Sequence, residues 1–307
     1  MSPLTVFGPG GAIVVLERSR DTLRVQGADA KTWLNGVLSC DVSRLTPHYG
    51  VYGLLLNKQG KIQAELDIIE GADAVWLGVS PGRAQLVREQ LDRVLVMEDA
   101  ELDHESGLCW LRLHGPRAVE LALSVREHVA AGAIDWLGFG GAALLVREGD
   151  LVSVLEFARS VGAHELDAGA WDALRIRQGF PHFGSDFSEE DNPHEASLER
   201  RAVSWTKGCY LGQEVVCMQD MRGRVKRRLV VLEIDGDPLV PFSNDVESPG
   251  EAAPVGKITS VARDGASSIA LSRLKFPFFE GAQPLSVGGR VARILAPASA
   301  GDGSFKH

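Results

Sequence analysis

The sequence predicts an α+β protein with antiparallel sheets and a small C-terminal β-barrel. The chain has 307 residues, long enough for two or three domains of ordinary size. Before residue 225, strand-like and helix-like patterns alternate irregularly with frequent hairpins, which favours α+β over a doubly wound fold. From residue 225 onward, short apolar–polar runs are separated by turn residues, a pattern typical of a small barrel or sandwich.

The first predicted α+β unit covers residues 1–105. Short strands are expected at 12–17 and 22–27, followed by a helix over 28–39 with Asp29 as its N-cap. Residues 49–70 form a predicted hairpin whose turn, Asn-Lys-Gln-Gly, lies at 57–60. A strand at 74–80 and an amphipathic helix over 81–96 complete the unit.

The second predicted unit, residues 106–224, repeats this organisation. A strand at 108–115, a helix over 116–129, a hairpin over 143–158 and a helix over 167–179 are expected. The predicted barrel occupies 225–300, with strands at 227–234, 253–261, 267–274 and 292–297. Residues 301–307 are expected to form a disordered tail.

The chain is acidic, with 32 basic and 41 acidic residues and a formal net charge of −9. This balance disfavours general affinity for nucleic acid or for anionic membranes. No apolar run approaches the roughly 20 residues of a membrane span, and the N-terminus has no secretory or transit pattern. We therefore expect a cytoplasmic protein with neither nucleic acid nor membrane as a partner.

The four cysteines lie at positions 40, 109, 209 and 217, without a C-x-x-C pair or a histidine at zinc-like spacing. In a reducing cytosol such scattered cysteines are expected to be free thiols. The pattern predicts no stably bound metal.

One cysteine stands in an unusual setting, the segment KGCYLGQEVV at 207–216. A structural cysteine prefers apolar surroundings, whereas Cys209 lies among polar and turn-forming residues. A neighbouring ammonium such as that of Lys207, or a helix N-terminus, would lower the pKa of the Cys209 thiol. The residues alone leave two interpretations open: a reactive thiol, or a buried, inert cysteine in a turn between a strand and a helix.

Two further stretches contain residues suited to bind a ligand. The run MRGRVKRR at 221–228 holds five basic residues and would suit carboxylates or phosphates, or else form a solvated strand edge. Trp171, in the helix before the loop 180–199, offers a flat face for a planar ring, or else packs in the core.

The string KGCYLGQE, unbroken from Lys207 to Glu214 and followed by Arg-Gly and a basic strand, resembles the signature of the YgfZ family. We call residues 207–214 the signature loop. The family comprises folate-binding proteins that support iron–sulfur cluster assembly, related to the aminomethyltransferase (T protein) of the glycine cleavage system. Segments 23–42, 55–66, 173–186 and 255–261 resemble other parts of the family, so the resemblance covers nearly the whole chain.

The resemblance implies two α+β units and a barrel around a central opening that receives tetrahydrofolate. It implies that Cys209 is a functional thiol of undefined role. The other signature-loop residues would be Lys207, Gly208, Tyr210, Gly212, Gln213 and Glu214. The residues expected to contact folate are Trp171, Arg175, Asn57, Glu65 and Arg222.

Two departures from the family qualify these expectations. Met218 stands where family members commonly have an arginine, so the resemblance does not carry over any ligand contact of that arginine. Aminomethyltransferases have Asp-Asp-Leu on the hairpin, where this chain has Ala64-Glu65-Leu66. Because misplacing a catalytic group by about 1 Å can lower a rate by roughly a hundredfold, aminomethyl transfer is disfavoured.

The leading hypothesis is therefore a tetrahydrofolate-binding accessory protein for assembly or repair of iron–sulfur clusters, with client proteins or assembly factors as partners. The alternative is a folate-dependent one-carbon transferase or demethylase that uses Glu65 or Glu214 as acid–base. A nucleic-acid module built on 221–228 ranks lowest, because no aromatic residue is interleaved with the basic run.

Overall fold

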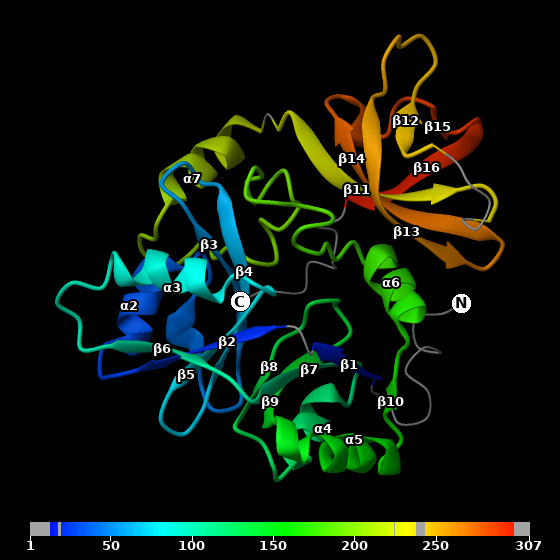
Figure 1. Cartoon of the computed structure of the whole chain (residues 1–307). Coiled ribbons are helices and arrows are strands. Elements are labelled where there is room, and N and C mark those ends of the chain that lie inside the picture. The colour runs from blue at the N-terminus through cyan, green and yellow to red at the C-terminus, as the bar shows by residue number, and fades with distance from the viewer. Residues whose placement is uncertain (1–12, 18–19, 224, 238–242, 298–307) are drawn as a thin grey trace. The chain divides into compact units, whose positions relative to one another are not determined.

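The computed structural model describes residues 13–17, 20–223, 225–237 and 243–297 (Figure 1). These residues form two compact units. The first comprises Met1–Lys58, Gln63–Leu166 and Ala202–Gln213, and the second comprises Gln59–Ile62, Asp167–Arg201 and Glu214–His307. The predicted tail, 301–307, lies outside the described residues.

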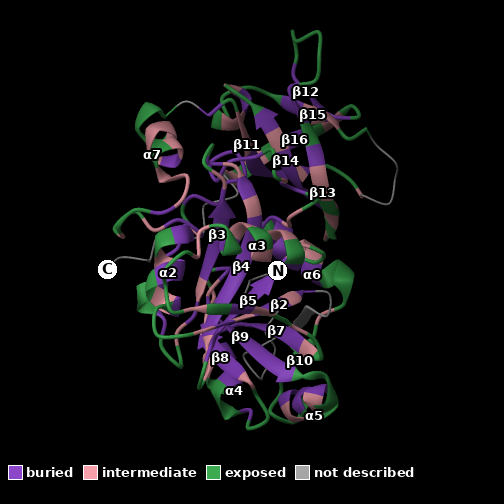
Figure 2. Cartoon of the chain, turned by 60° about the vertical axis from the view of Figure 1, so that its left-hand side comes forward, coloured by how far each residue is buried: buried purple, intermediate pink, exposed green. Residues whose placement is uncertain are grey.

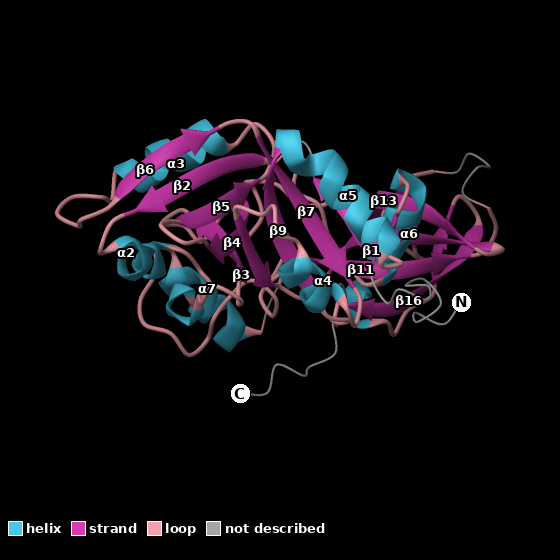
Figure 3. Cartoon of the chain, turned by 90° about the horizontal axis from the view of Figure 1, so that it is seen from below, coloured by secondary structure: helices cyan, strands magenta, loops and turns pink. Residues whose placement is uncertain are grey.

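The first unit contains a five-stranded sheet with the order β3-β4-β5-β2-β6. Helices α2 and α3 bury their apolar stripes against one face of it, because their buried residues share a core with side chains of β2 to β6 (Figure 3). The elements are β2 (Asp21–Gln26), α2 (Ala30–Val37), η1 (Val42–Arg44), β3 (Val51–Leu56), β4 (Ile62–Glu70), β5 (Val75–Val79), α3 (Ala84–Asp92) and β6 (Glu101–Glu105).

A second five-stranded sheet in the same unit has the order β10-β1-β7-β9-β8. Its pairs are antiparallel except for β1 and β10, which run parallel. Helices α4 and α5 cover one face and share its core. The elements are β1 (Ile13–Glu17), β7 (Leu108–His114), α4 (Ala118–Ser124), β8 (Ala130–Ala133), β9 (Gly141–Arg147), η2 (Glu148–Asp150), α5 (Leu151–Ser160) and β10 (His164–Glu165).

The faces of these sheets that lack helices pack against each other, which gives the first unit four layers. A Cβ added at Gly78 of β5 would lie 2.7 Å from the Trp110 ring of β7, so only glycine permits this close approach. The Trp110 indole also donates a 3.0 Å hydrogen bond to Thr22 Oγ1 on β2. Figure 2 shows the buried strands at the centre of the unit and exposed residues on the outer helices.

The second unit contains a closed barrel with the order β11-β14-β13-β12-β15-β16. Its apolar residues alternate along the strands and fill the barrel interior. Helix α6 packs outside the barrel, where Ile176 contacts a separate cluster of barrel side chains. The elements are α6 (Ala168–Arg177), α7 (Gln213–Arg222), β11 (Arg227–Ile234), β12 (Asp245–Glu247), β13 (Gly256–Asp264), β14 (Ser267–Lys275), η3 (Phe278–Glu280), β15 (Leu285–Val287) and β16 (Arg290–Pro297).

The predicted fold class is confirmed: helices and antiparallel sheets are mixed, and the C-terminal strands close into a barrel. The predicted domain limits remain a prediction. The limit at 105/106 falls between β6 and β7, which belong to different sheets, whereas β1 joins the sheet of β7. No helix among the described residues is long and apolar enough to span a membrane.

Two local predictions are wrong. The second strand of the hairpin over 143–158 is helix α5, because Leu151, Val154, Leu155 and Ala158 share one buried helical face. Asp29 occupies the N-cap position of α2 but does not cap it; its carboxylate instead accepts a 2.9 Å hydrogen bond from the Asp99 amide. The basic run 221–228 is divided between two elements, because Arg222 ends α7 and β11 begins at Arg227, as predicted for the strand at 227–234.

Candidate functional site

The signature loop is anchored to the C-terminal end of α2 by Lys207. Its ammonium donates hydrogen bonds to the carbonyls of Asn35, Leu38 (2.8 Å) and Cys40 (2.7 Å). A cation is favourable there, because the last carbonyls of a helix carry partial negative charge. Burial lowers the pKa of Lys207, partly offset by Cys40 and Asp41. Lys207 therefore holds the loop against α2.

The remaining loop residues have different environments. Tyr210 is buried, with its ring centroid 5.4 Å from Lys207 Nζ. Gly212 adopts a φ of 81°, a left-handed conformation that favours glycine, directly before α7 begins at Gln213. Glu214 is exposed in the first turn of α7. By contrast, a Cβ at Gly208 would meet nothing within 4 Å, so space alone does not require a glycine there.

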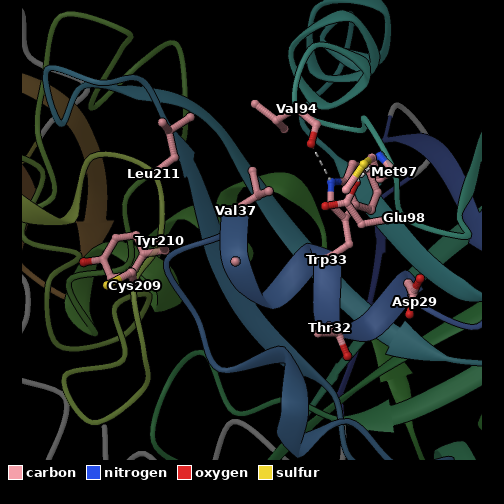
Figure 4. A pocket seen from close by; sticks show the side chains of 11 residues that line it. Asp29, Thr32, Trp33, Val37, Val94, Met97, Glu98, Cys209, Tyr210 and Leu211 are labelled. Carbon is pink, nitrogen blue, oxygen red and sulfur yellow. Dashed lines mark hydrogen bonds between the residues drawn. The ribbon is translucent and has the colours of Figure 1, made fainter.

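Cys209 is exposed and lines an open pocket of about 640 Å³ within the first unit (Figure 4). Cys209 is therefore not buried, whereas its reactivity and its chemical role stay predictions. The lining comes from α2 and the residue before it, from the segment after α3, and from the signature loop. It consists of Asp29, Thr32, Trp33, Gly36, Val37, Val94, Met97, Glu98, Cys209, Tyr210 and Leu211.

The other cysteines are less accessible than Cys209. Cys40 and Cys109 are buried and Cys217 is half-buried; all four are free thiols. Burial raises the pKa of the Cys40 thiol to about 12, so it is protonated at neutral pH. Because a thiolate is the reactive form and must be reached by its partner, Cys209 is better placed for chemistry than Cys40.

Glu65 lies in a buried polar layer between the two sheets of the first unit. Strand alternation puts Ala64 into the α2–α3 core and Glu65 on the opposite face of β4. Tyr52 donates a 2.5 Å hydrogen bond to Glu65 Oε2, and Arg20 lies 3.5 Å from Oε1. Burial, with the Glu65 charge, raises the pKa of Tyr52 well above its ordinary value. Tyr52 is therefore a neutral donor that fixes the carboxylate.

Asp67, two residues further along β4, extends this layer to the second sheet. Arg112 of β7 donates to both of its carboxylate oxygens, at 2.9 and 3.1 Å, and the Trp136 indole donates at 2.9 Å. The Arg112 guanidinium also lies 4.9 Å from the Trp136 ring centroid. His114 is fully buried nearby, 5.3 Å from the Trp136 ring between centroids. Sequence reasoning missed this network, whose members are scattered along the chain.

Trp171 and Arg175, one turn apart on α6, belong to the second unit. Trp171 is buried, with its ring centroid 6.3 Å from that of His182. The Arg175 guanidinium donates to Asp172 (2.6 Å), Asp186 (2.9 Å) and Ser260 (3.0 Å), and so joins α6 to the following loop and to β13. These contacts give Arg175 a structural role, and ligand contact by either residue stays a prediction.

The basic run pairs with acids of the second unit. Arg227 contacts Asp191 at 3.0 Å and Glu195 at 3.3 Å, and Arg228 pairs with Glu199. Arg222, at the end of α7, is exposed. Two of the five basic residues of the run, Arg227 and Arg228, are therefore paired within the fold, whereas Arg222 and Lys226 are exposed cations that a ligand can reach.

The expected folate contacts divide between the units. Asn57 and Glu65 belong to the first, whereas Trp171, Arg175 and Arg222 belong to the second. The structure adds the residues that form the pocket beside Cys209, such as Trp33 and Met97, which no motif had indicated. No group of three or more metal-ligating side chains occurs among the described residues.

Comparison with known proteins confirms the resemblance inferred from the signature. Residues 18–145 match the family model of the GCVT N-terminal domain. The chain is 24% identical to the tRNA-modifying protein YgfZ of Colwellia psychrerythraea, over 73% of this chain and 71% of that protein. The corresponding protein of Escherichia coli O157:H7 is 27% identical, over 73% of this chain and 72% of that protein.

Two broader similarities cover nearly the whole chain. A putative chloroplastic transferase of Arabidopsis thaliana is 25% identical over 93% of this chain and 70% of that protein. The crystal structure of the glycine cleavage system aminomethyltransferase T from Bartonella henselae matches with a TM-score of 0.74 at 17% identity, over 97% of this chain and 90% of that one. The chain is thus similar to YgfZ proteins and has the fold of an aminomethyltransferase.

Proposed function

We propose that this protein binds tetrahydrofolate and supports the assembly or repair of iron–sulfur clusters through Cys209. The observation that carries the thiol part of the proposal is the exposed Cys209 in a signature loop that Lys207 fixes to α2. The similarity to YgfZ proteins and to an aminomethyltransferase supports it. Soft thiolates suit iron–sulfur chemistry, and a single cysteine needs a partner protein to complete a site.

The residues present fit a folate in chemical terms. Among the residues that the structure describes, Glu65 Oε1 contacts Arg20 at 3.5 Å, and a carboxylate oxygen can accept a further hydrogen bond, such as one from a pterin N–H. Arg222 is an exposed cation suited to a glutamate carboxylate. Trp171 would supply a face for ring stacking. When bound, the folate would supply a one-carbon carrier.

Aminomethyl transfer is not part of this proposal. Ala64 is fully buried in the core, so the first acid of the aminomethyltransferase hairpin has no counterpart. Tyr52 and Arg20 hold the Glu65 carboxylate, which suits a positioning role better than proton transfer. We also infer that nucleic acid is not a direct ligand, because acids of the same unit pair with Arg227 and Arg228.

The folate part is tested by calorimetric titration of the purified protein with tetrahydrofolate. Trp171→Ala and Arg222→Ala should each weaken saturable binding, whereas Trp205→Ala and Lys226→Ala, two changes at exposed positions, should not. Because Trp171 is buried, circular dichroism must show that its variant folds; Arg222→Ala provides an independent test at an exposed position. Absence of binding by the wild type would refute the folate role.

The thiol part is tested in cells that lack this protein. Wild type and Cys217→Ser should restore the activity of iron–sulfur enzymes, whereas Cys209→Ser should not. Full restoration by Cys209→Ser would refute a functional thiol. Turnover of an N-methyl substrate that Glu65→Gln abolishes would favour the enzymatic alternative instead.

A further inference from the structure

We propose that the pocket beside Cys209 is the docking site for a basic segment of a partner polypeptide. An apolar side chain of that segment would enter the pocket, and a neighbouring cationic side chain would lie against Asp29 and Glu98. The inference rests on the proposed function, because it names the chemistry of the partner that reaches the Cys209 thiol.

The apolar part of the pocket is open to a partner. Trp33 and Val37 of α2 lie beneath it and are nearly buried. On its rim, Met97 is 91% exposed, and the adjacent Val96 is 80% exposed. Neighbouring exposed apolar side chains mark interaction sites, and a flexible methionine adapts to the shape of a partner. The rim is thus suited to pack against an apolar side chain of a polypeptide.

The negative charge of the pocket favours a positively charged partner. Within the described part of the chain, its lining contains two carboxylates, Asp29 and Glu98, and no lysine or arginine. Asp29 Oδ2 accepts from the Asp99 amide, and Glu98 Oε2 accepts from the amides of Val96 and Met97 at 3.0 Å each. Those amide bonds lower the pKa of Glu98, which is therefore ionised at neutral pH.

One oxygen of each carboxylate, Asp29 and Glu98, can accept a hydrogen bond from a partner. Among the described residues, no hydrogen bond or ion pair reaches Asp29 Oδ1 or Glu98 Oε1. Because both groups are anionic, phosphates and the carboxylates of a folate tail are repelled here, whereas lysine and arginine are attracted. The pocket is therefore a poor folate or nucleic-acid site and a suitable site for a basic segment.

The layout of the pocket indicates an extended occupant. Figure 4 shows Cys209 and Tyr210 at one end, Asp29, Trp33, Met97 and Glu98 toward the other, and Val37 between them. An extended segment can place one side chain at the thiol, the next apolar side chain over the middle and a cation at the carboxylates. A compact ligand would contact only one end.

The inference is tested by thiol exchange with short peptides whose cysteine is activated as a mixed disulfide with thionitrobenzoate. The Cys209 thiolate attacks the peptide sulfur, a disulfide forms, and the thionitrobenzoate thiolate leaves and is followed by its absorbance. The peptides are acetyl-Cys-Leu-Lys-amide, acetyl-Cys-Leu-Glu-amide and acetyl-Cys-Gly-Lys-amide. All proteins carry Cys217→Ser, and the Cys209→Ser, Cys217→Ser double variant gives the background rate.

At low salt, we expect the Leu-Lys peptide to react about fivefold to tenfold faster than the Leu-Glu peptide, and the ratio to approach one at high salt. Glu98→Gln should lower this ratio about threefold, whereas Glu101→Gln, at an exposed acid on β6, should leave it unchanged. Met97→Ser should reduce the advantage of Leu-Lys over Gly-Lys, whereas Val152→Ser, at an exposed apolar position on α5, should not.

Equal rates for all three peptides, or a preference for the acidic peptide, would overturn the docking inference. So would a charge preference that Glu98→Gln leaves intact. None of these results bears on tetrahydrofolate binding or on restoration of iron–sulfur enzymes by wild type, so the proposed function can stand when the docking site fails. Conversely, peptide selectivity together with full activity of Cys209→Ser in cells would refute the functional thiol while establishing the docking pocket.

Discussion

Arg112 of β7 binds both carboxylate oxygens of Asp67 on β4, with Nε 2.9 Å from Oδ2 and Nη2 3.1 Å from Oδ1. Both side chains are almost completely buried, and the pair joins the two sheets of the first unit. A buried ion pair contributes little net stability compared with a well-packed apolar pair, but removal of one partner leaves a buried charge uncompensated. The pair therefore links the two sheets, and loss of either partner is expected to be costly.

Asp67→Asn should strongly destabilise the protein, because the cations of Arg112 and Arg20 would lose their shared anion. We expect the free energy of unfolding to fall by roughly 3–5 kcal/mol, measured by urea denaturation. The matched control is Asp103→Asn, which removes one of the two acidic partners of Arg24 in a partly exposed cluster and should cost much less, because Glu105 remains and water screens the charges. Equal losses for the two variants would contradict the role assigned to the buried pair.

His114 should make the protein sensitive to acid. Burial, with the nearby Arg112 charge, lowers the pKa of His114 from 6.5 to about 3. Between these values the unfolded chain binds a proton that the folded protein does not, so stability falls as the pH falls, by up to about 1.4 kcal/mol per pH unit. Urea denaturation from pH 7 to pH 4 should show this slope reduced in His114→Gln and unchanged in His104→Gln, at an exposed position on β6.

Lys207→Met should release the signature loop from α2. The carbonyls of Leu38 and Cys40 would lose their charged donor, at an expected cost of roughly 1–3 kcal/mol in the free energy of unfolding. Hydrogen exchange followed by mass spectrometry should become faster in peptides that cover 34–40 and 207–212. Lys58→Met, at an exposed position in the hairpin turn, is the control. Unchanged exchange in both segments would show that the ammonium does not hold the loop.

Alkylation should distinguish the four thiols. With iodoacetamide at neutral pH, Cys209 should be labelled first and Cys217 more slowly, since the first is exposed and the second half-buried. Cys40 and Cys109 should be labelled only after denaturation, because both are buried and the pKa of Cys40 is raised to about 12. Peptide mass spectrometry identifies the order, and labelling of Cys40 before Cys209 would contradict the structure.

Much of the fold could be predicted from local patterns, because strand alternation, helical periodicity and turn residues act over a few positions. The hairpin around Asn57 and four of the six barrel strands are predictable in this way, whereas the three-residue strands β12 and β15 are too short to show an alternating pattern. The error at 151–158 was avoidable, since the buried positions repeat with helical spacing. That β1 and β2 enter different sheets depends on distant partners, and a single sequence does not reveal them.

The candidate site could be predicted only where its residues are contiguous. The signature loop is one string of letters, so Cys209 was identified directly. The pocket beside it combines α2, the segment after α3 and the loop, and the packing of these elements is a tertiary property. Likewise, the sequence left open whether the basic run binds a ligand. The fold pairs Arg227 with Asp191 and Arg228 with Glu199.

The attachment of Lys207 to α2 limits how far the signature can be transplanted. The carbonyls that receive its ammonium lie about 170 positions earlier in the chain. A decapeptide copied from 207–216 into an unrelated scaffold would carry the cysteine but not the helix end that shapes the loop around it. A functional graft would have to include the last turn of α2 and the residues that follow it. The signature loop thus functions as a structural unit only together with the C-terminal end of α2.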